Sequence, residues 1–142
     1  MEEIAQRGVW VPIEIKKDEK RELTSGLVNS GYRVEGPYIA LPAGLCKKLG
    51  IVPREPEPYE SSLWVTNETL FVRIVTKDKT SKWVEANVHI YMFRQYIIIS
   101  AQLADKLGIG IYKPYEGLWF FLDEGIEKIR KPANPKQYSL EF

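Results

Sequence analysis

The stretch that decides the fold occurs twice in this chain. Residues 38–51 read YIALPAGLCKKLGI, and residues 96–109 read YIIISAQLADKLGI. Offset by 58 positions, the two segments are identical at eight of their fourteen positions. Self-similarity at a fixed period is the sequence signature of a repeated supersecondary unit.

A second block follows each copy in the same order. Pro-Tyr-Glu and then Leu-Trp occur within residues 58–64 and recur within residues 114–119. Agreement over two separate blocks indicates an internal duplication. Two copies are too few for a solenoid, so we expect the halves to pack face to face as one pseudo-symmetric domain. The expected halves span about residues 8–76 and 82–131, with a tail at 132–142.

Each half predicts the same order of strands. A leading strand is expected at residues 82–93 in the second copy, and at residues 10–16 or 31–35 in the first. A short apolar strand follows at residues 38–41 and 96–99. The expected fold class is mainly β with two short helices (α+β), arranged as an internally duplicated, pseudo-twofold barrel.

A helix of about two turns follows each short strand. Pro42 suits a first helical position and Ser100 suits an N-cap, while Gly50 and Gly108 supply the C-terminal stops. Leucines spaced at i and i+4 are expected on the buried face of the two helices. They are Leu45, Leu49, Leu103 and Leu107.

Each half is expected to close with a β-hairpin around a polar turn. The turns are Asn67-Glu68 in the first copy, and Asp123-Glu124-Gly125 in the second, where residues 126–130 would form the returning strand. The mixed charge run at residues 16–22 is expected to be a solvated loop or helix face.

The composition is that of one globular domain with a substantial core, since 44% of the 142 residues are apolar. Twenty Lys and Arg against nineteen Asp and Glu give a formal charge of +1. Strong overall attraction to nucleic acid is therefore excluded, and DNA binding would need basic residues gathered on one face. No apolar run approaches the roughly 18 residues of a membrane span, and the acidic N-terminus is unlike a signal peptide. We expect a cytoplasmic chain with no membrane partner.

The chain has one cysteine and one histidine, Cys46 and His89, which excludes most sites that depend on these residue types. Zinc sites usually draw on several Cys or His ligands, and the only Cys–His nucleophile pair would be these two residues. No Gly-rich phosphate loop occurs. The carboxylates Asp123 and Glu124 lie in a predicted turn, where solvated side chains are the commoner case. We therefore expect no enzyme, no metal and no cofactor.

The strand–helix core resembles the AbrB/MazE/SpoVT family of swapped-hairpin DNA-binding domains. That family's signature is an apolar strand ending in proline, a short helix, and Leu-Gly-apolar before a β-hairpin. Residues 39–42 (IALP) and 49–51 (LGI) match it well, whereas residues 97–100 (IIIS) have serine in place of proline. The resemblance covers residues 38–75 and 96–130, and implies a small barrel of interleaved hairpins made by two copies in one chain.

The chain also departs from the family pattern. Family members commonly carry a Gly-Asp turn soon after Leu-Gly-Ile, but residues 52–60 and 110–116 instead end in Pro-Tyr-Glu. The helix centre is Cys-Lys-Lys at residues 46–48 and Ala-Asp-Lys at residues 104–106. The two halves are therefore not electrostatically equivalent, which disfavours symmetric operator binding.

The resemblance implies a DNA-binding regulator whose basic strands and loops contact the phosphates of duplex DNA. Residues 73–94 hold five Lys and Arg against two acids. Arg94 is the leading candidate because it precedes the short strand at residues 96–99, and Arg33 is its nearest counterpart in the first copy. The candidate contacts are Arg33, Lys47, Lys48, Arg73, Lys77, Lys79, Lys82, His89 and Arg94.

The alternative function is a non-enzymatic protein-interaction or inhibitor module, acting as a monomer or a homodimer. Four Trp and eight Tyr are many large aromatics for this length, although Trp64 and Trp119 recur at equivalent positions and are expected to be core. Aromatic arms and the tail would then dock a protein partner. The candidate contacts are Tyr59, Tyr115, Tyr138, Leu140 and Phe142.

Overall fold

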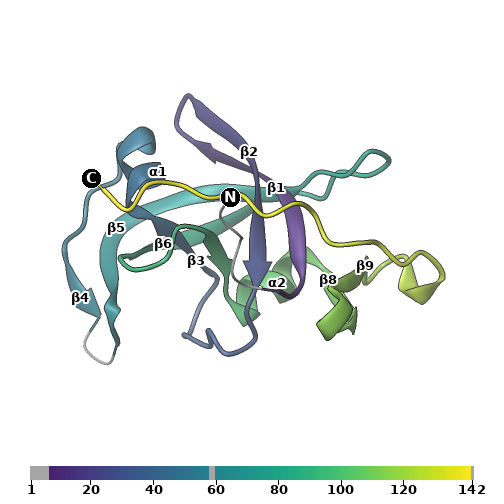
Figure 1. Cartoon of the computed structure of the whole chain (residues 1–142). Coiled ribbons are helices and arrows are strands. Elements are labelled where there is room, and N and C mark those ends of the chain that lie inside the picture. The colour runs from purple at the N-terminus through teal and green to yellow at the C-terminus, as the bar shows by residue number, and fades with distance from the viewer. Residues whose placement is uncertain (1–6, 58–59, 142) are drawn as a thin grey trace.

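A computed structural model describes residues 7–57 and 60–141 of the chain (Figure 1). Two candidate partner contacts, Tyr59 and Phe142, lie outside the described residues. The fold is mainly β with two short helices, as predicted. Six strands close into a barrel in the order β1-β2-β7-β3-β6-β5, because β5 also pairs with β1. They are β1 (Trp10–Lys17), β2 (Lys20–Val28), β3 (Tyr38–Pro42), β5 (Glu60–Ile74), β6 (Val84–Tyr91) and β7 (Ile97–Ile99).

The remaining elements attach to the ends of the barrel strands. They are α1 (Ala43–Leu49), β4 (Glu55–Glu57), α2 (Ala101–Leu107), β8 (Ile109–Lys113), the 3-10 turn η1 (Pro114–Glu116), β9 (Leu118–Phe121) and the 3-10 turn η2 (Gly125–Glu127). β4 pairs with β5 outside the barrel, whereas β8 and β9 form a separate antiparallel pair. In the described part of the chain, no helix is long and apolar enough to cross a membrane.

The strand pairings of the barrel are unchanged when β1, β2 and β3 are exchanged with β5, β6 and β7. β2 pairs in parallel with β7, and β6 pairs in parallel with β3. The central pair of β3 and β7 joins Ala40 to Ile98, which are 58 positions apart, the period of the sequence repeat. This pseudo-twofold scheme is what a duplicated chain predicts, and the duplication itself stays a prediction.

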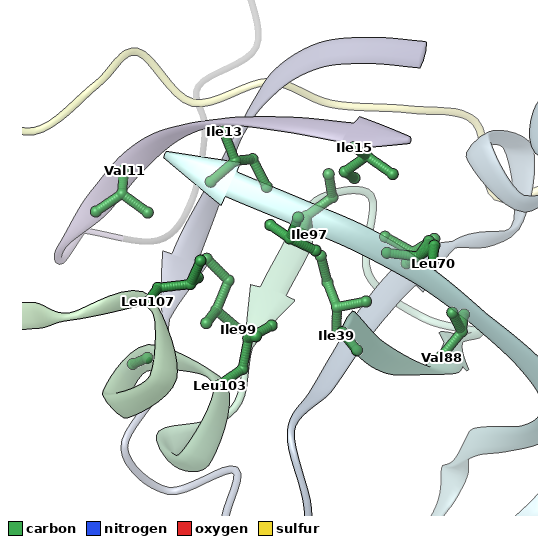
Figure 2. Packing of buried hydrophobic residues seen from close by; sticks show 14 of the residues in the cluster. Val11, Ile13, Ile15, Ile39, Leu70, Val88, Ile97, Ile99, Leu103 and Leu107 are labelled. Carbon is green, nitrogen blue, oxygen red and sulfur yellow. The ribbon is translucent and has the colours of Figure 1, made fainter. Parts of the chain in front are cut away.

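Alternate residues of the strands point into the barrel and form its core. Figure 2 shows inward side chains of β1, β3 and β7 meeting Leu103 and Leu107 of α2. Leu45 and Leu49 of α1 are buried in the same cluster, so the burial predicted for all four helix leucines is confirmed. A second apolar cluster lies outside the barrel, over β3 and β7. It consists of Trp10, Leu27, Tyr32, Ala40, Leu63, Tyr96 and Ile98.

The ends of α2 follow the predicted capping pattern. The Ser100 hydroxyl accepts a hydrogen bond from the backbone N–H of Leu103 at 3.2 Å, as an N-cap does. Gly108 ends α2 in the left-handed conformation, at φ 78°, and Gly50 ends α1 in the same way. The predicted N-cap at Ser100 and the predicted helix stops at Gly50 and Gly108 are therefore confirmed.

The start of α1 differs, because Pro42 is the N-cap and not the first helical residue. Its side chain offers no capping acceptor, and the C-terminal tail supplies one. The carbonyl of Ser139 accepts the N–H of Gly44 at 2.7 Å. The tail, yellow in Figure 1, crosses β1 and β2 and ends beside α1. It is also held at its beginning, where the N–H of Ala133 donates to the carbonyl of Trp10 at 2.8 Å.

Tyr138 anchors this tail inside the molecule. Its backbone N–H donates to the carbonyl of Gln95 at 2.6 Å, and its hydroxyl lies 2.8 Å from Oε2 of Glu22 and 2.7 Å from Oγ1 of Thr24. The ring also packs against the barrel core. Tyr138 is thus half-buried and engaged in internal contacts, which leaves less of it available for docking than predicted.

Residues 16–22 are exposed at their centre, residues 18–21, as predicted, but they form a tight strand reversal and not a long loop or a helix face. They end β1, reverse direction and begin β2, so that the two strands pair along their whole length. Asp18 makes the reversal at φ 55°, and the Lys17 ammonium is held 2.9 Å from the Glu68 carboxylate. The first copy therefore leads with a β1–β2 hairpin, and residues 31–35 form no strand.

β5 runs through Asn67 and Glu68 without a turn, so the first predicted hairpin is wrong. The register with β6 shifts at this point, and the polar pair is accommodated as an irregularity in one continuous strand. β6 on one side and β1 on the other hold β5 extended. Its later half buries Leu70, Val72 and Ile74. In the exchange of strands, β5 corresponds to β1, and the predicted boundaries of the two halves stay a prediction.

The second predicted hairpin is also different. β9 pairs with β8, and the Pro-Tyr-Glu segment forms the turn between them as η1. Residues 126–130 return to β9 only at one isolated bridge, between Trp119 and Arg130. Trp119 is buried in the barrel core, and the partly buried Trp64 packs against this core. Both placements are expected from the recurrence of the two residues.

Candidate nucleic-acid interface

The structure removes His89 from the predicted DNA contacts. Its ring stacks on Tyr38 with 4.3 Å between centroids, and a 2.6 Å hydrogen bond joins its Nδ1 to the Tyr32 hydroxyl. Strand alternation does place His89 on the outer face of β6, but the connection at residues 29–37 carries Tyr32 over that face. His89 is 1% exposed as a result, so the prediction is wrong for this residue.

Three other candidates form ion pairs within the protein. Arg73 lies 2.7 Å from the Glu14 carboxylate, and its guanidinium carbon is also 4.2 Å from the centre of the Trp83 ring. Lys48 lies 2.9 Å from Glu22. The third pair joins Lys79 to Asp123 at 2.8 Å.

The carboxylates in two of these pairs are held in their charged form. Burial would raise the pKa of Glu14, but hydrogen bonds from Arg73 and Arg21 outweigh it and lower the pKa. Burial likewise opposes the lowering of the pKa of Glu22, which hydrogen bonds from Lys48 and Tyr138 produce. The charges of Arg73 and Lys48 are therefore neutralised locally, which weakens both as phosphate contacts.

Five candidates are exposed and form no ion pair with another described residue: Arg33, Lys47, Lys77, Lys82 and Arg94. They lie in three places, namely α1, the turn between β5 and β6, and the two connections that lead into β3 and β7. Of these three places, only the two connections contribute one candidate arginine from each half of the barrel.

Acidic side chains accompany the cations at the turn between β5 and β6. Lys77 and Lys82 share this turn with Asp78, which the Arg130 guanidinium binds at 2.9 Å. Lys82 and Lys106 line a hollow of about 400 Å³ beside the end of α2, but Asp123 also lines it and pairs there with Lys79. This balance of charge makes the turn a poor anion site.

Arg33 and Arg94 occupy corresponding connections of the two halves. Arg33 lies between β2 and β3, and Arg94 lies between β6 and β7. The guanidinium carbon of Arg94 is 5.6 Å from the centre of the Tyr91 ring. Arg33 and Tyr91 line the same hollow. Tyr91 therefore shares the lining of the hollow with Arg33, while its ring lies beneath the Arg94 guanidinium, and the central pair of β3 and β7 lines the same hollow.

The hollow beside the β2–β3 connection and the end of β6 has a volume of about 340 Å³. The outward-facing central pair, Ala40 and Ile98, forms part of its lining, with residues of the β2–β3 connection and the start of β5. The candidate set from sequence does not include Tyr91 or Ala40. Tyr91 could have been found from the alternation of side chains along β6. Ala40 could have been found from the comparison of the repeats, where it is the alanine that aligns with an isoleucine, Ile98.

Of the candidate residues for protein docking, Tyr115 and Leu140 are exposed in the structure. Tyr115 in η1 is 75% exposed, with the guanidinium carbon of Arg7 4.9 Å from its ring centre. Leu140 in the tail is also exposed. Other apolar side chains of the β8–β9 arm (residues 109–127) are exposed too: Ile111, Tyr112, Leu122 and Ile126.

The thiol of Cys46 and the imidazole of His89 are not in contact. Cys46 is buried in the barrel core, where burial raises the pKa of its thiol to about 12, so the reactive thiolate is suppressed. His89 lies outside the barrel, against Tyr32 and Tyr38. Among the described residues, no group of three or more His, Cys, Asp or Glu is placed to hold a metal ion.

Comparison of this chain with protein-family models, with curated protein sequences and with solved structures finds no match.

Proposed function

We propose that the chain binds duplex DNA through the face that lies across its pseudo-twofold axis, with Arg33 and Arg94 at the phosphates. The observation that carries the proposal is the placement of these two arginines. They come from corresponding connections, both are exposed, and neither forms an ion pair with a described residue. The resemblance of residues 38–51 to AbrB-like domains supports the same function.

The chemistry of this face suits a polyanion with bases. A guanidinium is a planar fork that can donate two hydrogen bonds to phosphate oxygens. Tyr91, which lies beneath Arg94 and lines the hollow with Arg33, and the exposed Phe93 add aromatic surface to the contact. With a net charge of only +1, the affinity would be modest and would depend on the few cations of this face.

Binding of a labelled mixed-sequence duplex, followed by fluorescence anisotropy at several salt concentrations, tests the proposal. Each phosphate contact contributes about 0.9 to the slope of log K against log salt. The double variant Arg33→Gln, Arg94→Gln should therefore bind more weakly and reduce the slope by up to about 2, with little dependence on sequence. The double variant Lys20→Gln, Lys113→Gln makes the same change in charge at exposed positions elsewhere and should bind like the parent protein.

Two results would count against this function. If the parent protein retains no duplex at low salt, where phosphate attraction is strongest, DNA is not its ligand. If the parent protein binds but the arginine variant keeps the parent's slope, the contact face lies elsewhere.

Protein docking is the second candidate, and the exposed apolar side chains of the β8–β9 arm favour it. A partner held by Tyr115 and other exposed apolar side chains of this arm would stay bound as salt is raised, because apolar contacts are not screened. The Arg33→Gln, Arg94→Gln variant would then keep its partner, which separates this function from DNA binding.

A further inference from the structure

The hollow over the central pair of β3 and β7 has the features of a small-molecule site. Its volume of about 340 Å³ lies within the range of ligand pockets. Most of the lining is apolar or aromatic. Three polar side chains, Asn29, Arg33 and Ser62, and the backbone of Gly31 complete it. The apolar and aromatic residues are Tyr32, Val34, Ala40, Leu63, Tyr91 and Ile98.

One difference between the repeats lies at the floor of this pocket. Ala40 of β3 pairs with Ile98 of β7 at the pseudo-twofold axis, and the two residues occupy the same position of the repeat. Both side chains lie at the floor of the pocket, where Ala40 is 1% and Ile98 is 4% exposed. The floor is therefore asymmetric, with a small side chain on β3 and a large one on β7.

The pocket wall is held in place by contacts behind it. The Tyr32 hydroxyl is joined to Nδ1 of His89 at 2.6 Å, and the His89 ring is stacked on Tyr38 at an interplanar angle of 18°. The carbonyl of Tyr32 accepts the N–H of Ala101, the first residue of α2, at 3.1 Å. These contacts organise the connection at residues 29–37 before any ligand arrives, which reduces the entropy lost on binding.

Arg33 determines the charge of the ligand that would fit. It lines the pocket, is exposed, and pairs with no carboxylate of the described residues. We propose that this pocket binds a small molecule that has an aromatic or branched apolar body and one anionic group. The apolar body lies over Ala40 and Ile98, and the anionic group pairs with the Arg33 guanidinium. This inference does not depend on DNA binding.

Two related fluorescent probes test the proposal on the full chain. Anilinonaphthalene sulfonate carries an aromatic body with one sulfonate, and phenylnaphthylamine has the same aromatic body without it. We expect both probes to bind at one saturable site. Arg33→Gln should weaken the sulfonate about tenfold, the effect of losing one charge-assisted hydrogen bond, and leave the neutral probe within about twofold. Arg94→Gln is the matched control, because Arg94 does not line the pocket, and it should leave both affinities unchanged.

Ala40→Ile places the residue of the other repeat in the pocket, and should weaken both probes by at least about tenfold through steric overlap. Circular dichroism and thermal unfolding show whether this variant is folded. The proposal fails if neither probe saturates, or if a folded Ala40→Ile variant binds like the parent protein. It also fails if Arg33→Gln changes the two probes equally or changes neither, a result that remains decisive if Ala40→Ile does not fold.

Discussion

Replacing Gly44 by alanine tests how firmly the C-terminal tail is held against α1. Gly44 lies in the first turn of α1, and its N–H is bonded to the carbonyl of Ser139. A Cβ atom at this position would lie 2.7 Å from the carbonyl oxygen of Ser139 and 2.9 Å from its Cβ. Because both contacts are shorter than van der Waals separation, the tail must move away.

Two opposing effects set the size of the change in stability. Alanine favours the helix over glycine by at most about 1 kcal/mol. Displacing Ser139 removes its hydrogen bond with Gly44, which contributes about 1 kcal/mol. It also pulls on Tyr138, whose hydrogen bond to the charged Glu22 contributes about 2 kcal/mol. We therefore expect Gly44→Ala to lower the free energy of unfolding by about 2 kcal/mol.

Equilibrium unfolding in urea measures this change, and a shortened chain provides the control. In a chain that ends at Gln137, the contacts of Tyr138 and Ser139 are absent and only the helix preference remains. There Gly44→Ala should be neutral or stabilising by up to about 1 kcal/mol, so the sign of the effect changes or the effect disappears. If Gly44→Ala stabilises the full chain, the tail does not hold α1 as described.

Three further predictions concern buried polar groups. Hydrogen bonds from Lys48 and Tyr138, working against burial, hold the pKa of Glu22 below its ordinary value of 4.5. Its stabilising effect is present at neutral pH and is lost as pH falls through the lowered pKa, so urea midpoints should drop in acid and Glu22→Gln should flatten that drop. Cys46 should resist a thiol reagent in the native protein and react once urea unfolds it, because burial raises the pKa of its thiol to about 12; rapid native labelling would contradict its burial. Ser100→Ala should lower the free energy of unfolding by about 1 to 2 kcal/mol, since Ser100 caps α2 and also accepts the N–H of Tyr38 at 3.0 Å; an unchanged thermal midpoint would show that this cap contributes little.

The sequence predicts the parts of the fold that local patterns determine. The repeat locates β3, α1, β7 and α2, because a short apolar strand, a cap, paired leucines and a glycine stop all act within a few residues of each other. Their pairing at Ala40 and Ile98 also agrees with the repeat period. A small barrel is expected from the resemblance and not from these local patterns, and the closing pair of β1 and β5 is not predicted.

Long-range contacts explain the failures. Asn67 and Glu68 carry the local signal of a turn, but β6 pairs with β5 both before and after them and keeps the strand extended. β2 begins in a charge run, and its Glu22 is paired there by Lys48 and by Tyr138 from the far end of the chain. A sequence pattern holds no information about either partner.

In the candidate site, too, the sequence predicts local features and misses long-range contacts. The pattern of basic residues correctly finds exposed cations such as Arg33 and Arg94. It does not show that Arg73 is paired with Glu14, 59 residues away, or that Lys79 is paired with Asp123, 44 residues away. His89 is buried because a neighbouring connection folds over it, which strand alternation alone does not predict.

The most direct test of the proposed DNA face is a backbone amide NMR titration of the full chain with a mixed-sequence duplex at low salt. We expect the largest shift changes in residues 29–37 and 92–96, the two connections that carry Arg33 and Arg94, and we expect them to fade as salt is raised. Shift changes confined to the β5–β6 turn or to the β8–β9 arm, or an unchanged spectrum, would contradict the proposed face.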